Sequence, residues 1–329
     1  MIRSFCTLAA AAWLAGAALL PSPAQAQAQP QSFTRAVRIV VPYAPGGSSD
    51  ILARLIAPKL QEAIGQAVVV ENKPGGSGNI GADAVAKAAK DGHTLLLLDV
   101  GTLALAPSLF PDLTFDPQKD LAPVGMIMFA PYVLAVSPTL PAKSVAELIA
   151  YAKANPGKVA VANSGIGGMN HVTPIRIGKA LGVEWKNVPY RGGAAATRAV
   201  VAGESQVIFN GVSGSLQFVK NGQLVGLAVS GPARLPSVPD LPTFDEAKLP
   251  AGDAGTWQGL MVTAGSPPAL VARLDAELRK IVAMPDIAQK IGELGGTVKA
   301  DGPESFKVWL AANVKTLGEV VRENGIKGE

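Results

Sequence analysis

The feature that most constrains the fold is a unit in which a short apolar strand runs into a glycine-rich turn and then into a helix. Its first occurrence covers residues 38–56, which read RIVVPYAPGGSSDILARLI. Residues 39–41 have the β-branched bias of a buried strand, and apolar residues recur at helical spacing from Ile51 onward. A chain that alternates strands and helices in this way is typical of an α/β fold with a mostly parallel sheet and crossover helices.

The turn within this unit has the properties of an anion site. Gly46 and Gly47 leave no side chain to block a ligand, while Ser48, Ser49 and Asp50 are candidate N-caps of the helix that follows. Free amides and the positive end of the helix dipole should therefore point out of the turn. Many α/β proteins have such turns without a ligand, so a purely structural role is the alternative.

The same unit recurs along the chain. A strand over residues 67–71 leads into the glycine-rich turn 72–79 and a helix over 80–90. A strand over residues 159–162 opens into the turn 163–171, and a helix follows. Ligands of α/β sheets bind beyond the carboxyl ends of the strands, which is where these turns lie.

A short sequence repeat suggests that the chain has two similar halves. VPYRGG at residues 188–193 repeats the Val-Pro-Tyr and Gly-Gly of residues 41–47, so we expect each half to present a similar turn to one cleft. The chain crosses between the halves near residue 130 and returns near residue 235, and these two crossings form a hinge. The predicted division is residues 29–130 plus 236–329 for lobe 1 and residues 131–235 for lobe 2.

The remaining apolar patterns complete the prediction of secondary structure. A proline-rich stretch over residues 232–242 is expected to be a surface connector without regular structure of its own. Further strands are predicted over residues 94–98, 129–136, 206–209, 224–230 and 257–262, and further helices over residues 145–154, 194–202, 269–282, 286–294 and 303–324.

The start of the chain indicates export. Arg3 precedes an apolar run over residues 8–20, which is shorter than the roughly 20 residues that span a bilayer, and small-x-small cleavage sites follow it. We therefore expect residues 1–28 to be a signal peptide that is cleaved on export to the periplasm. Cys6 is the only cysteine, so the mature chain would have no disulfide, thiolate metal site or cysteine nucleophile.

The charge balance argues against a nucleic-acid partner. The chain has 29 Lys and Arg residues and 25 Asp and Glu residues, and removing Arg3 leaves 28 against 25. No basic run and no basic stripe with interleaved aromatic residues occurs. No second apolar stretch is long enough to cross a membrane.

Signs of catalysis are few. The sequence contains no G-x-S-x-G, H-E-x-x-H or G-x-x-x-x-G-K-[ST] motif. His93 is most simply a turn residue, whereas His171 either orients a bound carboxylate or satisfies loop carbonyls. Ser164 with His171 could form a nucleophile and base of a secreted hydrolase, but no third group is placed to orient the imidazole. An enzyme is therefore not expected.

A dinucleotide site is the main alternative. Residues 76–81 match G-x-G-x-x-G between a strand and a helix, and Asp99 ends the next strand at the spacing of a ribose-binding acid. This pattern would make the chain an oxidoreductase. Against it, Pro74 and Gly75 lengthen the turn, the unit is not the first in the sheet, and an exported protein meets little nicotinamide cofactor.

Four motifs, in this order and spacing, resemble the Bug family of periplasmic substrate-binding receptors of tripartite tricarboxylate transporters. They are VPYAPGGSSDILAR, ENKPGGSGNIGADAVAKAAKDGHTLL, NSGIGGMNH and VPYRGGAAA. The resemblance implies a two-lobed, Venus-flytrap binding protein, similar to the type II periplasmic binding proteins. It also implies a small organic acid as ligand, delivery to a membrane permease, a monomeric receptor, and no cofactor or metal.

The resemblance also implies the ligand contacts, carried over motif by motif. Asn210 stands where many relatives have an aspartate, so recognition of an amine is not expected there, and Thr102 lies in a loop that departs from the usual pattern. The implied contacts of lobe 1 are Tyr43, Ala44, Gly46, Gly47, Ser48 and Thr102. Those of lobe 2 are Ser164, Gly165, Gly167, His171, Tyr190, Arg191 and Asn210.

Overall fold

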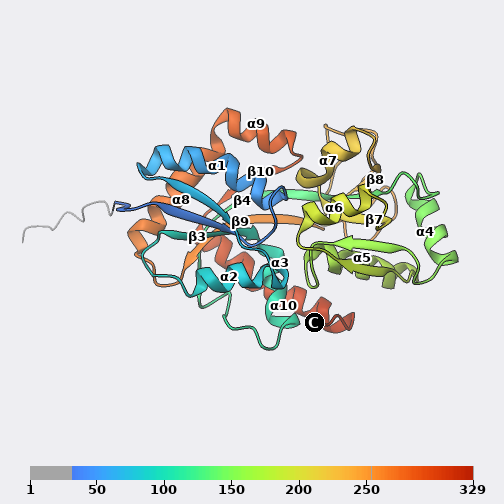
Figure 1. The fold of residues 1–329 in the computed structure, drawn as a ribbon, viewed down its shortest axis with the longest axis horizontal. Helices are drawn as coiled ribbons and strands as arrows, with labels where there is room; N and C mark the ends of the chain where they lie inside the picture. The colour runs from blue at the N-terminus through green and yellow to red at the C-terminus, as the bar shows by residue number, and fades with distance from the viewer. Residues whose placement is uncertain (1–31, 253, 329) are drawn as a thin grey trace, which may run out of the picture. The chain divides into compact units, whose positions relative to one another are not determined.

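Figure 1 shows the computed structural model of the protein, which describes residues 32–252 and 254–328. The predicted signal peptide lies outside these residues. The strands are β1 (Val37–Val41), β2 (Val68–Asn72), β3 (Thr94–Asp99), β4 (Leu121–Val136), β5 (Ala160–Asn163), β6 (Lys186–Pro189), β7 (Val207–Gly211), β8 (Val225–Val229), β9 (Gly255–Thr263) and β10 (Thr297–Asp301).

The helices alternate with the strands as the sequence predicts. They are α1 (Ser48–Ile64), α2 (Asn79–Ala86), α3 (Val100–Leu109), α4 (Val145–Ala154), α5 (Met169–Leu181), α6 (Gly193–Val201), α7 (Val212–Lys220), α8 (Pro268–Ala283), α9 (Pro285–Glu293) and α10 (Pro303–Glu323), with a short 3-10 turn, η1 (Gly76–Gly78), before α2. Among the residues described, none of the helices is both long and apolar enough to cross a membrane.

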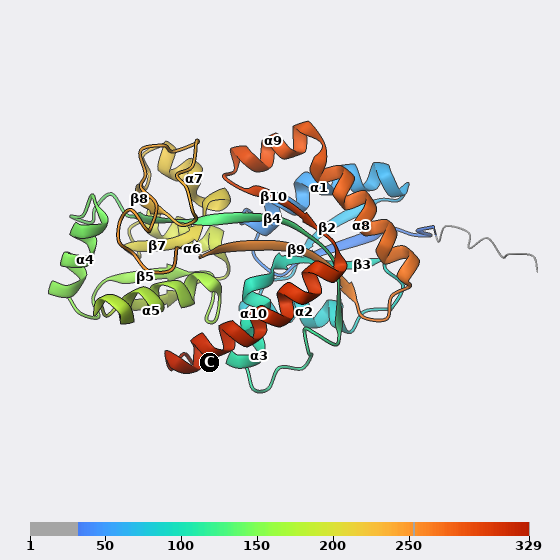
Figure 2. The same ribbon diagram turned by 180° about the vertical axis from the view of Figure 1, so that it is seen from behind.

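The strands follow the order β2-β1-β3-β9-β4-β7-β5-β6, with β8 and β10 also paired to β4. We name the strands up to the first part of β4 the first sheet, and the strands from the second part of β4 onward the second sheet. β4 belongs to both, because residues 121–131 pair with β9 and residues 132–136 pair with β7 and β8. Figures 1 and 2 show β4 and β9 running side by side between the two groups of elements.

The prediction of a mostly parallel sheet is only partly right. β1 pairs in parallel with β2 and β3, and β5 pairs in parallel with β6 and β7, as crossover helices require. The pairs of β3 with β9, and of β4 with β7, β8, β9 and β10, are antiparallel. The two long strands that join the sheets therefore run against their neighbours.

The faces of the first sheet are covered by different helices. Ile39 and Val41 are fully buried against one face, where Leu52 of α1 and Leu274 of α8 pack. Val40 points to the opposite face, which α2, α3 and α10 cover. This is the alternation expected of a strand, whose successive side chains point to opposite faces.

The second sheet is covered in a similar way. α6 and α7 pack on one face through Ala196 and Leu216. Phe209 of β7 lies on the other face and meets Phe244 edge-on, with ring centroids 6.2 Å apart. Phe244 also donates its backbone N–H to Val229 of β8, so the return segment that follows the proline-rich stretch lies on the second sheet.

Three elements were not predicted. α3 is apolar all round and therefore shows no amphipathic pattern. α7 is amphipathic, with Val212 and Leu216 buried one turn apart, but Gly211 and Gly214 at its start are typical of a turn. β10 is short and pairs only with β4 among the described strands. Pro58 lies inside α1 without ending it, and the helix continues to Gly65, which caps it in the left-handed conformation.

Candidate ligand-binding site

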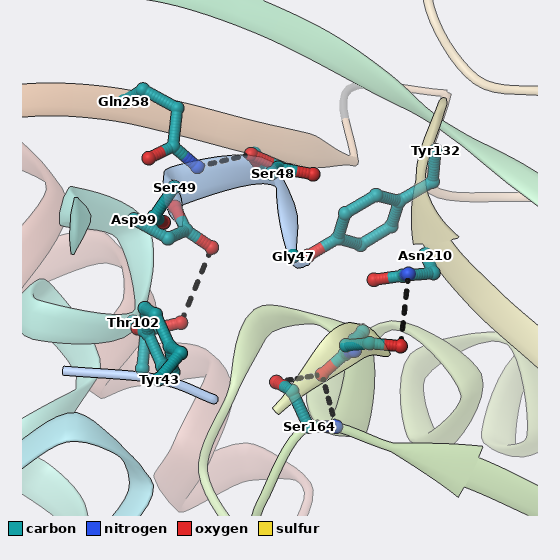
Figure 3. Close-up of a pocket in the computed structure, with 13 residues that line it drawn as sticks. Tyr43, Gly47, Ser48, Ser49, Asp99, Thr102, Tyr132, Ser164, Asn210 and Gln258 are labelled. Carbon is teal, nitrogen blue, oxygen red and sulfur yellow. Dashed lines mark hydrogen bonds between the residues drawn. The ribbon is translucent and has the colours of Figure 1, made fainter. Parts of the chain in front are cut away.

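A narrow cavity of about 40 Å³ lies where the carboxyl ends of strands from both sheets meet. Figure 3 shows its walls. One wall comes from the turn before α1, the start of α3 and β9, and the other from the starts of α5 and α6 and the end of β7. The lining residues are Tyr43, Gly47, Ser48, Ser49, Asp99, Thr102, Tyr132, Ser164, Asn170, Gly193, Asn210, Thr256 and Gln258.

Two helices present their N-terminal amides to this cavity. α1 begins after Gly47 and α6 after Gly192, and neither N-cap residue has a side chain that satisfies the first amides. The two turns face each other, because a Cβ atom placed on Gly192 would lie 3.4 Å from the backbone N of Ala44. Uncapped helix N-termini that converge in this way offer free N–H donors and a positive potential, which favour an anion.

The turn before α1 is held in shape by the buried carboxylate of Asp50. Asp50 accepts hydrogen bonds from the backbone N–H of Gly46 at 2.9 Å, from Asn72 at 2.9 Å and from Arg54 at 3.0 Å. Although burial alone would raise the pKa of Asp50, these hydrogen bonds lower it below the usual range of an aspartate. The charge of Asp50 is therefore already paired, and the turn is rigid before a ligand arrives.

Hydrogen bonds join the two walls around the cavity. Ser213 of α7 donates to the hydroxyl of Ser48 at 2.7 Å, and the backbone N–H of Met169 donates to Thr102 at 3.4 Å. The hydroxyl of Ser77 donates to the backbone carbonyl of Ile166. The structure thus represents an arrangement in which the walls are in contact.

Polar side chains of the second wall are positioned by their own neighbours. Asn210 donates to Thr197 and Ser215, each at 3.1 Å, which orients its amide at the start of α6. Ser164 donates to the amide oxygen of Asn170 at 2.8 Å. Side chains fixed in this way present hydroxyl and amide groups in a constant geometry.

The first wall contains groups that the protein leaves without partners. The hydroxyl of Tyr43 is buried near the side chain of Thr102 and is left without a partner, and Gln258 has an unpartnered amide oxygen. Burial and the nearby charge of Asp99 raise the pKa of Tyr43, so the phenol is protonated and is a donor. Buried groups without partners in a cavity indicate positions that a ligand or water fills.

Six of the predicted contacts line this cavity: Tyr43, Gly47, Ser48, Thr102, Ser164 and Asn210. Gly165, Tyr190 and Arg191 instead line a separate hollow with Ser77 and Phe110. The Tyr190 hydroxyl is turned toward Ser205, at 3.1 Å, and Arg191 is exposed. The repeated Gly-Gly turns therefore both lie at the cavity, as predicted from the sequence repeat. The two tyrosines of the repeat point in different directions.

Ala44, Gly46, Gly167 and His171 line neither space. His171 is buried, and its Nδ1 accepts the backbone N–H of Gly167 at 3.1 Å. Burial lowers the pKa of His171, so the ring is neutral at pH 7. Because Ser164 bonds to Asn170 and His171 bonds to the loop, the two do not form the nucleophile and base of a hydrolase.

Seven lining residues were missed by sequence reasoning. Ser49, Gly193 and Asn170 lie inside motifs that had been singled out, and Asp99 had been assigned to the dinucleotide alternative. Tyr132, Thr256 and Gln258 come from β4 and β9, which carry no local motif. Only the pairing of these strands in three dimensions brings them to the cavity.

The glycine pattern at residues 76–81 has a packing role. A Cβ on Gly81 would lie 2.6 Å from the Cβ of Pro42, and a Cβ on Gly78 would lie 3.3 Å from the Tyr43 hydroxyl. Asp99 accepts the backbone amides of Gly101 and Trp257, each at 3.1 Å, instead of facing a nucleotide turn. Among the described residues, no group of His, Cys, Asp and Glu could hold a metal ion.

Comparisons with known proteins agree with this geometry. Residues 52–326 match the model of the tripartite tricarboxylate transporter family receptor. The chain is 35% identical over 294 residues to a protein encoded in the tcbD–tcbE intergenic region of Pseudomonas sp. strain P51, covering 88% of this chain and 87% of that one. It is 32% identical over 309 residues to BugT of Bordetella pertussis strain Tohama I, covering 94% of each chain.

Solved structures show the same fold. The periplasmic binding protein BugD is 31% identical with a TM-score of 0.86, over 90% of this chain and 100% of that one. The R. palustris protein Rpa4515 with adipate is 31% identical with a TM-score of 0.86, and the match covers 90% of this chain and 99% of that one. MatC from Rhodopseudomonas palustris with bound malate is 30% identical with a TM-score of 0.83, and the match covers 88% of this chain and 99% of that one. The oxidoreductase alternative is therefore not supported, and the prediction that the chain is not an enzyme is confirmed by its relatives.

Proposed function

The chain belongs to the tripartite tricarboxylate transporter receptor family, and from this membership we propose that its cavity captures a small carboxylate for delivery to a membrane permease. The observation that supports the proposal most strongly is the convergence of the α1 and α6 N-termini on one cavity. Adipate and malate, which the two solved relatives hold, are both small carboxylates.

The cavity suits reversible binding of an acid. Among the described residues that line it, none is Lys or Arg, so the carboxylate would be held by backbone amides and hydroxyls. Such donors bind an anion without changing their own protonation state and without a chemical reaction. Ser48 and Tyr43 supply hydroxyl donors from the first wall, whereas the hydroxyl of Ser164 already donates to Asn170 and can only accept a hydrogen bond.

Release of the ligand would require the walls to separate. We place the hinge at the two points where the chain passes between the sheets, in β4 near Pro131 and at the start of β9 near Gly255. The second point lies later than the lobe boundary at residue 235, because Phe244 packs with Phe209 of the second sheet. Opening would break the few hydrogen bonds that join the walls, such as the one between Ser213 and Ser48.

The cellular setting follows from the family. BugD, a relative over nearly the whole chain, is a periplasmic binding protein, and a periplasmic location applies to this receptor as well. Cleavage of residues 1–28, action as a monomer and docking to a permease are parts of the proposal. Capture in the periplasm followed by release to a membrane partner is consistent with a site that opens and closes without a reaction.

The direct test is a calorimetric and thermal-shift screen of the mature protein against small mono-, di- and tricarboxylates and aromatic acids, with NAD as a control. We expect at least one acid to give saturable binding and to raise the melting temperature, because ligands that bind only the folded state stabilise it. Stabilisation by NAD, with none by the acids, would overturn the proposal.

A further inference from the structure

One charged group in the cavity has no place in a site built only for an anion. Asp99 is buried, with 8% of its surface exposed, and it lines the cavity beside Tyr43 and Thr102. Among the described lining residues it is the only carboxyl group, and none of the others is a cation. A second carboxylate brought into this space would face Asp99 without a counter-ion from the side chains around it.

The hydrogen bonds of Asp99 leave one side of the carboxyl available. Its Oδ1 accepts the backbone N–H of Gly101 and of Trp257, each at 3.1 Å, and so caps α3. Its Oδ2 accepts only the hydroxyl of Thr102, at 3.2 Å. An aspartate has about four lone-pair sites, so Oδ2 keeps the capacity to accept a further donor from the cavity.

A second acceptor lies on the same wall. Gln258 of β9 is 1% exposed, donates its amide nitrogen to Thr256 at 2.8 Å and has no partner for its amide oxygen. Unfilled acceptors of Asp99 and Gln258 thus accompany the free donors at the N-termini of α1 and α6. This combination fits a ligand that carries both an acidic group and a hydrogen-bond donor.

We propose that Asp99 is a specificity-determining residue, which makes the cavity prefer small carboxylates that bear a hydroxyl or ammonium group over the same acids without it. The inference rests on the proposed function and names the class of acid that this site takes. The carboxylate lies at the α1 and α6 amides, and the donor of the ligand fills the free position on Asp99 Oδ2. Burial disfavours the charge of Asp99, and the ligand's donor offsets that cost when it binds.

The test uses matched acids that share a carbon skeleton and differ at one carbon. Succinate, malate and aspartate form one such series, and propionate, lactate and alanine form a shorter one. By calorimetry, we expect the better of the hydroxyl and ammonium forms to bind at least about 10-fold more tightly than the plain acid. Comparison of the affinities for malate and aspartate shows whether the site prefers a neutral hydroxyl or a charged ammonium group on the ligand.

Asp99→Asn should abolish this preference. The Asn oxygen can still cap α3, whereas its amide nitrogen replaces the acceptor Oδ2 with a donor. We expect the ratio of affinities to fall by about 10-fold or more, with the plain acid bound more tightly than by the wild type. Asp286→Asn, which removes the same charge from an exposed position on α9, should leave the ratio unchanged.

The outcomes separate this inference from the proposed function. If acids bind but the matched acids bind equally, or if Asp99→Asn weakens all of them by one factor, Asp99 has only its structural capping role and the inference is wrong. If no acid binds, the proposed function fails and the inference fails with it. Should Asp99→Asn not fold, Asp99→Ser, which also retains a capping oxygen, serves for the same comparison.

Discussion

Asp99 should destabilise the empty protein when it is ionised, and Asp99→Asn should relieve that effect. Burial raises the pKa of Asp99 from 3.8 to about 6, against the hydrogen bonds of Trp257, Gly101 and Thr102. An acid whose pKa is higher in the folded state stabilises that state below its unfolded pKa, and the stabilisation is lost as the pH rises through the folded pKa. The sensitive window therefore runs from about pH 4 to pH 6.

The magnitude follows from the size of the shift. A difference of about two pKa units corresponds to roughly 3 kcal/mol, which is an upper value for one buried carboxyl. For a chain of about 300 residues this changes the melting temperature by about 5 °C. Tyr43 and Tyr132 are the other titratable groups beside Asp99, and burial raises the pKa of both, so neither titrates in this window.

The assay is urea unfolding of the ligand-free wild type and of Asp99→Asn at several values between about pH 4 and pH 7.5. We expect the stability of the variant relative to the wild type to rise by up to roughly 3 kcal/mol across this range. Asp286→Asn should show no such trend. A relative stability that stays constant with pH, or that falls, would refute the reasoning, because Asp99 would then ionise as easily in the folded protein as in the unfolded chain.

Three further changes test other parts of the structure. Gly81→Val should cost about 1–3 kcal/mol in urea unfolding because its side chain collides with Pro42, whereas Gly292→Ala, with open space around it, should cost nothing. Ser164→Ala should weaken binding of the preferred acid about 10-fold in calorimetry, with little change in melting temperature, because it removes a hydroxyl acceptor of the cavity wall and the hydrogen bond that orients Asn170. Phe244→Ala should destabilise by about 3–5 kcal/mol, since the ring is fully buried against Phe209; a cost below about 1 kcal/mol would contradict its place in the core of the second sheet.

Much of the fold was accessible from the sequence because local patterns determine it. The β-branched run before Pro42 and the helical spacing after Ser49 predicted β1 and α1, and the same logic identified most later elements. α3 escaped because Val100 to Leu109 is apolar on all sides and shows no helical face. The long β4 was predicted only from residue 129, because Pro123 and Gly125 break the apolar pattern between residues 121 and 128.

The cavity was only partly accessible for a different reason. Gly47, Ser48 and Ser164 lie in turns whose glycine and serine content predicts an anion site, and this local composition was sufficient to place them at the cavity. Thr256 and Gln258 reach the cavity because β9 pairs with both β3 and β4, which no local pattern reveals. Tyr190 illustrates the opposite error, since its motif matches that of Tyr43 but its side chain turns toward Ser205.

The most direct measurement of the central claim is a crystal structure of the mature protein with the acid that binds it most tightly. We expect the ligand's carboxylate to accept hydrogen bonds from backbone amides at the start of α1, near Ser48, and at the start of α6, near Gly193. A ligand that touches only one wall, or that sits in the hollow beside Tyr190 and Arg191, would contradict the account.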